Sequence, residues 1–362
     1  MGKRLSTIYA AICTLLLVAG FVLVFYFSWV SSMTDVALCL VGLLVSVVLA
    51  PIVHELGHVC FAKLAKMECV YVKCFCFKYY LKEGKKRFAF ASPFAPDQTQ
   101  VLPQRSGNMK KRACLYTLGG LICSGAFLFA LTLAAVLTAC LGPTSYYLWA
   151  TLPYTAYLFL LNLPAFEYAN GKTDGAVYRG ILRGEDVEKC MLAAMEIQGQ
   201  LFEGKSFSQI DEGYYFDLPQ LCEDEPMYAV ILDLRYRYYI EKGDEEKAAD
   251  CLNRLALNEA YLPFSELEKV AAELVYMHTL TGNLEDAERN YTVCKNFLKG
   301  ESATAKRILC AYTLATQKED VTAILLEQAQ RALEKERIAG VKKFEEILLA
   351  RLANKKDENR AN

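Results

Sequence analysis

An uneven distribution of charge restricts the fold of this chain more than any other feature. No Asp, Glu, Lys or Arg occurs from Ala113 to Phe166 or from Val36 to Val53, whereas the sequence after Leu182 is rich in both signs. About 20 apolar residues in a helix cross a bilayer core of about 30 Å. The first half is therefore predicted to lie in a membrane, and the second half to be water-soluble.

Membrane-spanning helices are predicted for four stretches, namely Ile8–Trp29, Val36–Ala62, Cys114–Leu141 and Tyr146–Pro164. The last two are separated by Gly142-Pro143, a dipeptide typical of turns. Lys3 and Arg4 precede the first stretch as in a signal peptide. The apolar run is longer than usual and no clear cleavage site follows it, which favours an uncleaved anchor.

The orientation of these helices is predicted by the basic residues near their ends. Lys63–Arg112 has a strong excess of Lys and Arg over acidic residues, and the connections at Ser31–Asp35 and Gly142–Ser145 have no basic residue. We expect a multi-pass protein of a bacterial cytoplasmic membrane, with the N-terminus, the central loop and the C-terminal domain in the cytoplasm. The net charge of -1 gives no reason to expect nucleic acid as a partner.

The motif His54-Glu55-Leu56-Gly57-His58 contains two of the three histidines of the chain and lies at the end of an uncharged run. Residues four apart share one face of a helix, so both imidazoles can reach one metal ion while Glu55 lies beside them. Ionisable side chains in a membrane span are costly and usually mark a functional site. The pattern predicts a zinc site in a membrane helix.

A zinc site that performs catalysis needs a third protein ligand and an open position for water. His278 lies among apolar residues of the soluble half, where a packing role is expected. Asp174 is the preferred third ligand because it follows the fourth span, Pro164 and Gly171, in a context typical of a turn near the membrane surface. Glu167 is the alternative.

The loop at 67–112 has the alternation of a β-hairpin, with one continuous strand through Cys74 and Cys76 and a turn at Lys82-Glu83-Gly84-Lys85. Its aromatic side is predicted to rest among lipid headgroups. A more specific hypothesis is that an edge strand pairs with an extended substrate segment. The fourteen cysteines have no repeating pattern and are interpreted as free thiols.

The soluble half has a helical pattern with two similar units, Tyr228–Glu241 with Gly243 and Leu267–Leu280 with Gly282. A weaker third unit covers Ala303–Thr316 and Val321–Lys335. Each is a helix, a turn and a second helix, as in repeats that stack and bind protein partners. We interpret the region as a small α-solenoid resembling tetratricopeptide arrays. A plain helical bundle is the alternative.

The predicted fold is therefore mostly α-helical. A four-span membrane domain covers residues 1–183, with a core at 36–182 and a small β-hairpin insertion at 67–112. A cytoplasmic helical-repeat domain covers 184–354, and a disordered tail covers 355–362.

In the order of its motifs, Val36–Leu182 resembles the site-2 protease family of intramembrane zinc metalloproteases. His54-Glu55-Leu56-Gly57-His58 matches the family's HExxH motif. Gly120 and Ser124 are similar to its Gly-x-x-x-Asn/Ser/Gly element, and Asn162, Pro164 and Asp174-Gly175 look like its Asn-Pro … Asp-Gly element. The chain departs from the family in a longer spacing between Asn162 and Asp174 and in Leu121, where many members have proline.

The resemblance implies one Zn²⁺ per chain, bound by His54, His58 and Asp174, with Glu55 activating water and with Gly120, Ser124 and Asn162 in supporting roles. It implies as substrate a membrane-anchored protein or a remnant signal peptide, cleaved in or near its transmembrane segment. The remaining partners are the lipid bilayer and a protein bound by the helical repeats. The alternatives are an inactive membrane scaffold that acts through those repeats and another zinc enzyme of the membrane.

Overall fold

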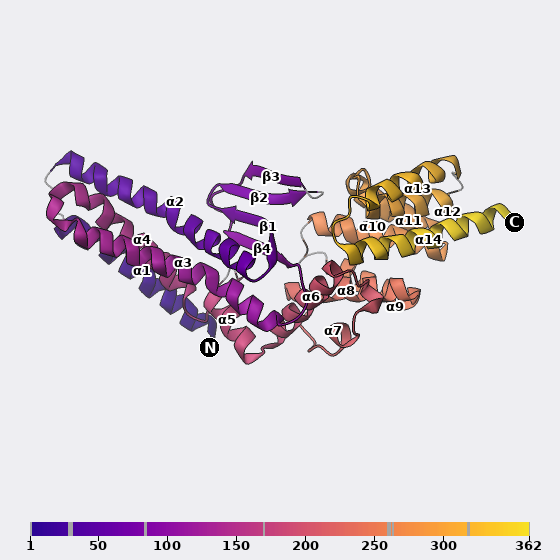
Figure 1. Cartoon of the computed structure of the whole chain (residues 1–362), viewed down its shortest axis with the longest axis horizontal. Coiled ribbons are helices and arrows are strands. Elements are labelled where there is room, and N and C mark those ends of the chain that lie inside the picture. The colour runs from indigo at the N-terminus through magenta and orange to yellow at the C-terminus, as the bar shows by residue number, and fades with distance from the viewer. Residues whose placement is uncertain are drawn as a thin grey trace. The chain divides into compact units, whose positions relative to one another are not determined.

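The computed structural model describes residues 2–27, 32–82, 85–168, 171–258, 262, 264–316 and 319–361, and these are mostly helical (Figure 1). They form two compact units. The first comprises Met1–Lys82, Lys86–Leu102 and Asn108–Glu188, and the second comprises the rest. The boundary lies inside a helix, a few residues beyond the predicted position at 183.

The first unit contains the helices and strands α1 (Gly2–Phe27), α2 (Met33–Leu64), β1 (Met67–Cys74), β2 (Phe77–Lys82), β3 (Lys85–Phe90), β4 (Gln98–Pro103), α3 (Met109–Leu137), the 3₁₀ helix η1 (Ala139–Ser145), α4 (Tyr146–Asn162), β5 (Glu167–Tyr168), β6 (Gly171–Lys172) and α5 (Asp174–Arg183). Helix α6 (Asp186–Phe202) begins in the first unit and continues into the second.

Within the described residues, three helices are long and apolar enough to cross a membrane, at Arg4–Tyr26, Met33–Leu64 and Met109–Leu137. They support the predicted association with a membrane. The predicted fourth span is shorter, because α4 has only 17 residues and contains Pro153. At 1.5 Å per residue, α4 is about 26 Å long, slightly less than a bilayer core of about 30 Å.

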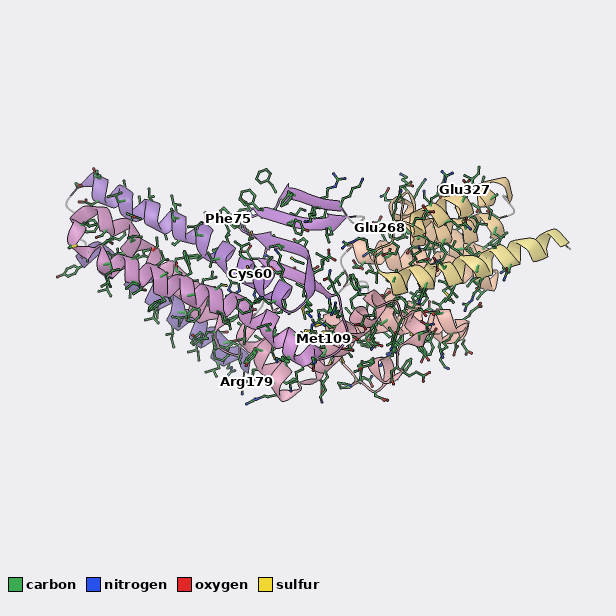
Figure 2. The ribbon with its side chains drawn as sticks, in the orientation of Figure 1. Cys60, Phe75, Met109, Arg179, Glu268 and Glu327 are labelled. Carbon is green, nitrogen blue, oxygen red and sulfur yellow. The ribbon has the colours of Figure 1, made fainter. Side chains whose placement is uncertain are left out.

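The predicted β-hairpin is part of a larger antiparallel sheet with the strand order β3-β2-β1-β4. The prediction of one continuous strand through Cys76 was wrong. The chain turns after Cys74, where Phe75 has a left-handed φ of 51°, and this turn is marked by Phe75 in Figure 2. Strand β4 was not predicted. Asp97, just before it, pairs with the buried Lys73 of β1 at 2.7 Å.

Helices α2 and α3 pack closely because glycines lie at their contact. A Cβ atom on Gly57 would be 2.4 Å from the carbonyl oxygen of Gly119, and a Cβ atom on Gly119 would be 2.7 Å from that of Gly57. The end of α2 is also tied to α3, since Arg112 donates hydrogen bonds to the carbonyl oxygens of Ala65 and Lys66, each at 2.7 Å. Small residues permit such close approach of membrane helices.

The second unit contains η2 (Phe207–Gln209), α7 (Gly213–Phe216), α8 (Pro226–Lys242), α9 (Glu245–Leu257), α10 (Phe264–Thr281), α11 (Leu284–Leu298), α12 (Ala303–Ala315), α13 (Glu319–Leu333) and α14 (Ala339–Ala361). The paired helices lie at the predicted positions, and their assignment to a tetratricopeptide-like solenoid stays a prediction. The predicted disordered tail at 355–362 was wrong for its described residues, since α14 continues to Ala361. Its residues are mostly good helix formers, and they extend a helix that already packs through Phe344 and Leu348.

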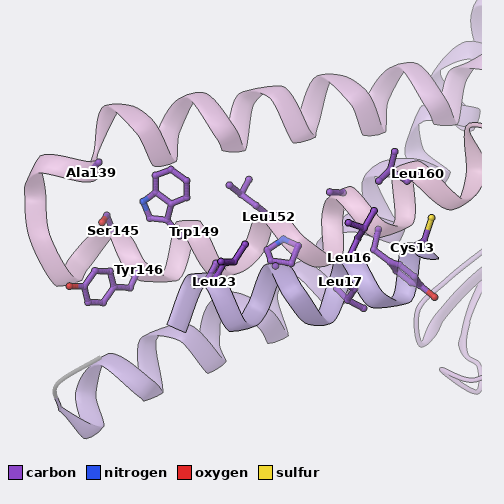
Figure 3. A pocket seen from close by; sticks show the side chains of 15 residues that line it. Cys13, Leu16, Leu17, Leu23, Ala139, Ser145, Tyr146, Trp149, Leu152 and Leu160 are labelled. Atoms are coloured by element: carbon purple, nitrogen blue, oxygen red, sulfur yellow. The ribbon is translucent and has the colours of Figure 1, made fainter. Parts of the chain in front are cut away.

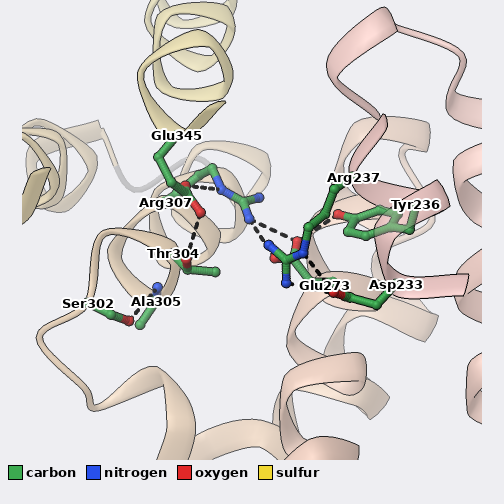
Figure 4. Close-up of polar contacts among 9 residues, drawn as sticks. All are labelled: Asp233, Tyr236, Arg237, Glu273, Ser302, Thr304, Ala305, Arg307 and Glu345. Atoms are coloured by element: carbon green, nitrogen blue, oxygen red, sulfur yellow. Dashed lines mark hydrogen bonds and ion pairs between the residues drawn. The ribbon is translucent and has the colours of Figure 1, made fainter. Parts of the chain in front are cut away.

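A buried ion-pair network joins four helices of this unit (Figure 4). The fully buried Arg307 of α12 pairs with Glu273 of α10 and Glu345 of α14, each at 2.7 Å. Glu273 also accepts a hydrogen bond from Tyr236 of α8 at 2.7 Å. Removal of one member of such a network leaves a buried charge without its partner, which destabilises the packed helices.

All fourteen cysteines are free thiols, as predicted.

Candidate metal centre

Three potential metal ligands, two from α2 and one from the start of α5, converge at the cytoplasmic end predicted for α2. The side chains of His54, His58 and Asp174 place one nitrogen or oxygen each within 4.8 Å of one another. Oδ2 of Asp174 lies 3.0 Å from Nε2 of His54 and 3.3 Å from Nε2 of His58. Two ligands bound about 2.0–2.2 Å from one tetrahedral zinc ion are about 3.4 Å apart, so the spacing suits zinc.

The contacts of Nδ1 in the two rings favour the neutral tautomer that has its lone pair on Nε2, which is the form that binds a metal ion. Nδ1 of His58 lies 3.1 Å from the carbonyl oxygen of Tyr116, which only accepts hydrogen bonds, so Nδ1 carries the proton and a neutral ring has its lone pair on Nε2. Nδ1 of His54 lies 3.0 Å from the hydroxyl of Ser124 and can donate in the same way. Partners of this kind orient metal-binding histidines.

The carboxylate of Asp174 completes the set. Its Oδ2 atom is buried and has no hydrogen-bond partner among the described residues. Burial raises the pKa of Asp174, whereas the two histidine rings, in the metal-free state with Nε2 protonated, lower it to about 2. The carboxylate is therefore ionised at neutral pH. An anionic oxygen and two lone pairs in contact form an arrangement that a cation stabilises.

Helix α3 provides the space for this arrangement. A Cβ atom on Gly120 would be 2.4 Å from Nε2 of His58 and 2.7 Å from Cε1 of His54, so only glycine fits there. Ser124, one turn further along, supports His54. Gly120 and Ser124 were predicted as supporting residues chiefly for helix packing. The structure gives them direct contacts with the histidines as well.

The longer spacing before Asp174 is taken up by a small hairpin. Strands β5 and β6 pair through Glu167 and Lys172, and the hydroxyl of Thr173 donates to the carbonyl oxygen of Pro164 at 2.6 Å. Asp174 then begins α5, and Gly175 is required because its Cβ atom would be 2.1 Å from the carbonyl oxygen of Leu163. The hairpin reverses the chain direction and brings it back toward the end of α4. The residues that lengthen the spacing between Asn162 and Asp174 therefore do not move the carboxylate of Asp174 away from the histidines.

The other candidates lie outside the group of three. Glu167 is exposed on β5, and the half-buried His278 lies on α10 in the second unit. The amide of Asn162 donates to the carbonyl oxygen of Leu158 in its own helix, at 3.2 Å. This bond links Asn162 to its helix and not to the metal ligands, so the structure gives it no direct supporting contact with them.

Glu55 is buried beside the two histidines and has partners that the sequence analysis missed. Thr99 of β4 donates a hydrogen bond to its Oε2 at 2.5 Å, and Tyr116 donates to the carbonyl oxygen of Thr99 at 2.6 Å. A signal for Tyr116 was present in the sequence. Tyr116, Gly120 and Ser124 are spaced by four and therefore share one face of α3. Thr99 had no such signal because β4 was not predicted.

An apolar cavity of about 710 Å³ lies elsewhere in the first unit, between α1 and α4 (Figure 3). It is lined by side chains such as Leu16, Leu23, Trp149 and Leu152, and by none of the three ligands. Its lining is mostly apolar, so the cavity lacks the polar groups of a catalytic site and suits a hydrocarbon chain.

The centre brings together three potential metal ligands with a carboxylate next to them, and the side chain of Asp174 is 19% exposed. No family model matches the chain, and no similar curated protein or solved structure was found. The interpretation therefore rests on the geometry of the site and on the sequence motifs.

Proposed function

We propose that this protein is an intramembrane zinc metalloprotease of the site-2 protease type, which hydrolyses peptide bonds in or near the transmembrane segments of membrane-anchored proteins. One observation carries the proposal. His54, His58 and Asp174 converge with electron-rich atoms 3.0 and 3.3 Å apart, and Glu55 lies beside them. A structural zinc site normally has four protein ligands, whereas three leave a position for water.

The proposed reaction assigns a role to each side chain. Zinc bound by the three ligands would lower the pKa of a coordinated water to about 7 and polarise the scissile carbonyl. Glu55 would act as the general base that takes a proton from the attacking water, and it would return that proton to the leaving amine. Ser124 and the carbonyl oxygen of Tyr116 hold the histidine rings in the orientation and tautomer that present Nε2.

The substrate must be extended at the cleavage site, because a membrane helix has all its backbone groups hydrogen-bonded internally. Strand β4 is an edge strand of the sheet and carries Thr99 next to Glu55. This placement supports pairing of an unwound substrate segment with the sheet edge. Residues that weaken helices should therefore favour cleavage.

The topology proposed for the protein places α1 to α4 in the membrane and both ends in the cytoplasm. The sheet supports a location at the bilayer surface. Phe88, Phe90 and Phe94 are 80%, 79% and 96% exposed, and no charged residue lies between Phe88 and Pro96. Exposed apolar patches of this kind mark contacts with proteins or membranes. Lys86, two residues before Phe88 and therefore on the same face of β3, suits anionic headgroups.

Tryptophan at Phe88 is expected to contact lipid. In a variant without the natural Trp29 and Trp149, Phe88→Trp should be strongly quenched by brominated lipids in reconstituted vesicles. Arg87→Trp is the matched control, since successive side chains of a strand point to opposite faces. It should be quenched much less. Equal quenching of the two variants would contradict insertion of the aromatic face.

Addition of a methyl group at Gly120 is expected to weaken zinc binding about 10- to 100-fold, as for other groups that orient ligands. The physical reason is the contact of 2.4 Å between its Cβ atom and Nε2 of His58. Zinc affinity of Gly120→Ala, measured by competition with a chelator, checks this. Gly125→Ala is the control on the same helix, where the nearest atom is 3.3 Å away on the ring of Phe159. Equal affinities for zinc would contradict the proposed site.

The proposed function is tested by a cleavage assay in liposomes. The wild type and Glu55→Gln are compared on a panel of single-span membrane proteins, and zinc is measured in the same samples. The proposal expects cleavage of at least one protein by the wild type only. Bound zinc without any cleavage of this panel, and normal cell function of Glu55→Gln, would favour the membrane scaffold instead.

A further inference from the structure

We propose that Thr99 is a positioning residue for Glu55 and that Tyr116 holds Thr99 in place. This inference rests on the proposed function, in which Glu55 acts on water. It assigns to strand β4, which lies within the loop at 67–112, a direct part in aligning the reacting groups.

The first step is the contact between Thr99 and Glu55. The hydroxyl of Thr99 donates to Oε2 of Glu55 at 2.5 Å. Among the described residues, Thr99 is the only hydrogen-bond partner of that carboxylate. A carboxylate has two oxygens, so the bond leaves Oε1 to accept a hydrogen bond from water while the side-chain torsions are restrained. Without Thr99, the carboxylate of Glu55 loses this restraint.

The second step is the attachment of Thr99 to α3. The phenol of Tyr116 donates to the main-chain carbonyl of Thr99 at 2.6 Å, and the main-chain carbonyl of Tyr116 accepts from Nδ1 of His58. The ring of Tyr116 also packs against that of His58, with 5.2 Å between centroids. Tyr116 thus connects β4, which carries Thr99, to His58, which is a proposed ligand of the metal.

This link restrains Glu55 relative to the metal ligands. His58 and Glu55 both lie on α2, but β4 reaches the centre from outside the helices and needs a separate attachment. Misplacement of a reacting group by about 1 Å can cost about 100-fold in rate. The chain therefore uses the side chain and the backbone of one threonine for two different contacts.

Thr99→Val tests the proposal because it removes the hydroxyl, retains the shape and suits a β-strand. We expect kcat to fall about 10- to 100-fold on the single-span protein that the wild type cleaves fastest, with KM and zinc content unchanged. Thr99→Ser retains the donor and should stay within about 3-fold of the wild type. Binding of a peptide hydroxamate, which chelates zinc and hydrogen-bonds to a neighbouring carboxylate, should weaken in Thr99→Val and not in Thr99→Ser.

Tyr116→Phe keeps the ring and the carbonyl that binds His58 but loses the bond to Thr99. It should lower kcat less than Thr99→Val, and the double variant should resemble Thr99→Val alone because both changes act through one contact. A kcat of Thr99→Val equal to that of an active wild type overturns this inference alone. Loss of zinc in Thr99→Val, or failure of Thr99→Ser to restore kcat, also overturns it. A wild type that neither binds zinc nor cleaves any protein overturns both proposals.

Discussion

Glu55→Gln is expected to abolish proteolysis while zinc remains bound. The glutamine side chain has the same shape and its amide oxygen still accepts the hydrogen bond from Thr99, so the site should keep its geometry. An amide cannot take the proton of water, however, and loss of a general base typically costs about 100- to 10,000-fold. The measurement is the rate of cleavage of a single-span substrate in liposomes, together with zinc content by atomic absorption.

The matched control is Glu167→Gln, the same chemical change at an exposed carboxylate of the first unit. It should cleave and bind zinc as the wild type does. If Glu55→Gln retained full activity while binding zinc normally, another group would have to act on water, and the role proposed for Glu55 would be wrong. If Glu55→Gln lost zinc as well, the residue would be needed for the metal site and not only for proton transfer.

Asp174→Asn is expected to lose zinc. The change removes the negative charge from the buried Oδ2 atom, which lies 3.0 and 3.3 Å from the two histidine nitrogens. Since loss of a group that only supports a ligand costs about 10- to 100-fold in metal affinity, loss of an anionic ligand should cost at least about 100-fold. Zinc content after dialysis against a weak chelator measures this, and cleavage should be lost in parallel.

The same Glu167→Gln variant separates the two carboxylates that the sequence left as alternatives for the third ligand. Only Asp174→Asn should release zinc, because the side chain of Glu167 is exposed on β5 and lies outside the group of three. Release of zinc by Glu167→Gln, with retention by Asp174→Asn, would assign the third ligand to Glu167 and require a rearrangement of the β5–β6 hairpin. Asp174→Asn and Glu167→Gln both replace a carboxylate by an amide, so comparing their zinc content shows which of the two carboxylates is the ligand.

Much of the local structure was predictable because it depends on neighbouring residues. The apolar runs predicted α1, α2 and α3, and the spacing of His54 and His58 predicted that both rings lie on one helix face. The turns at Gly243 and Gly282 predicted the helix boundaries of the second unit, since both glycines adopt the left-handed φ that favours glycine. Each of these features has a period or a turn that can be recognised in a short window.

The two errors have physical causes that lie outside the short windows used to predict them. The strand predicted through Cys76 ends earlier because Asp97, from a distant part of the loop, binds Lys73 and the backbone nitrogen of Phe75. The helical end of α14 is a continuation of a helix anchored in the core of its unit. The first error thus arises from contacts with another part of the chain, and the second from continuation of a packed helix into residues that favour helix.

By itself, the sequence determined that a pair of histidines and a glutamate lie together near the end of an apolar helix. That result needs only the helical period and the absence of charge. The tertiary structure alone decided that Asp174 meets both rings, that Gly120 makes room for them, and that Thr99 contacts Glu55. Those contacts join residues that are far apart in the chain, and their distances depend on how closely α2, α3, α5 and β4 pack, which no local pattern encodes.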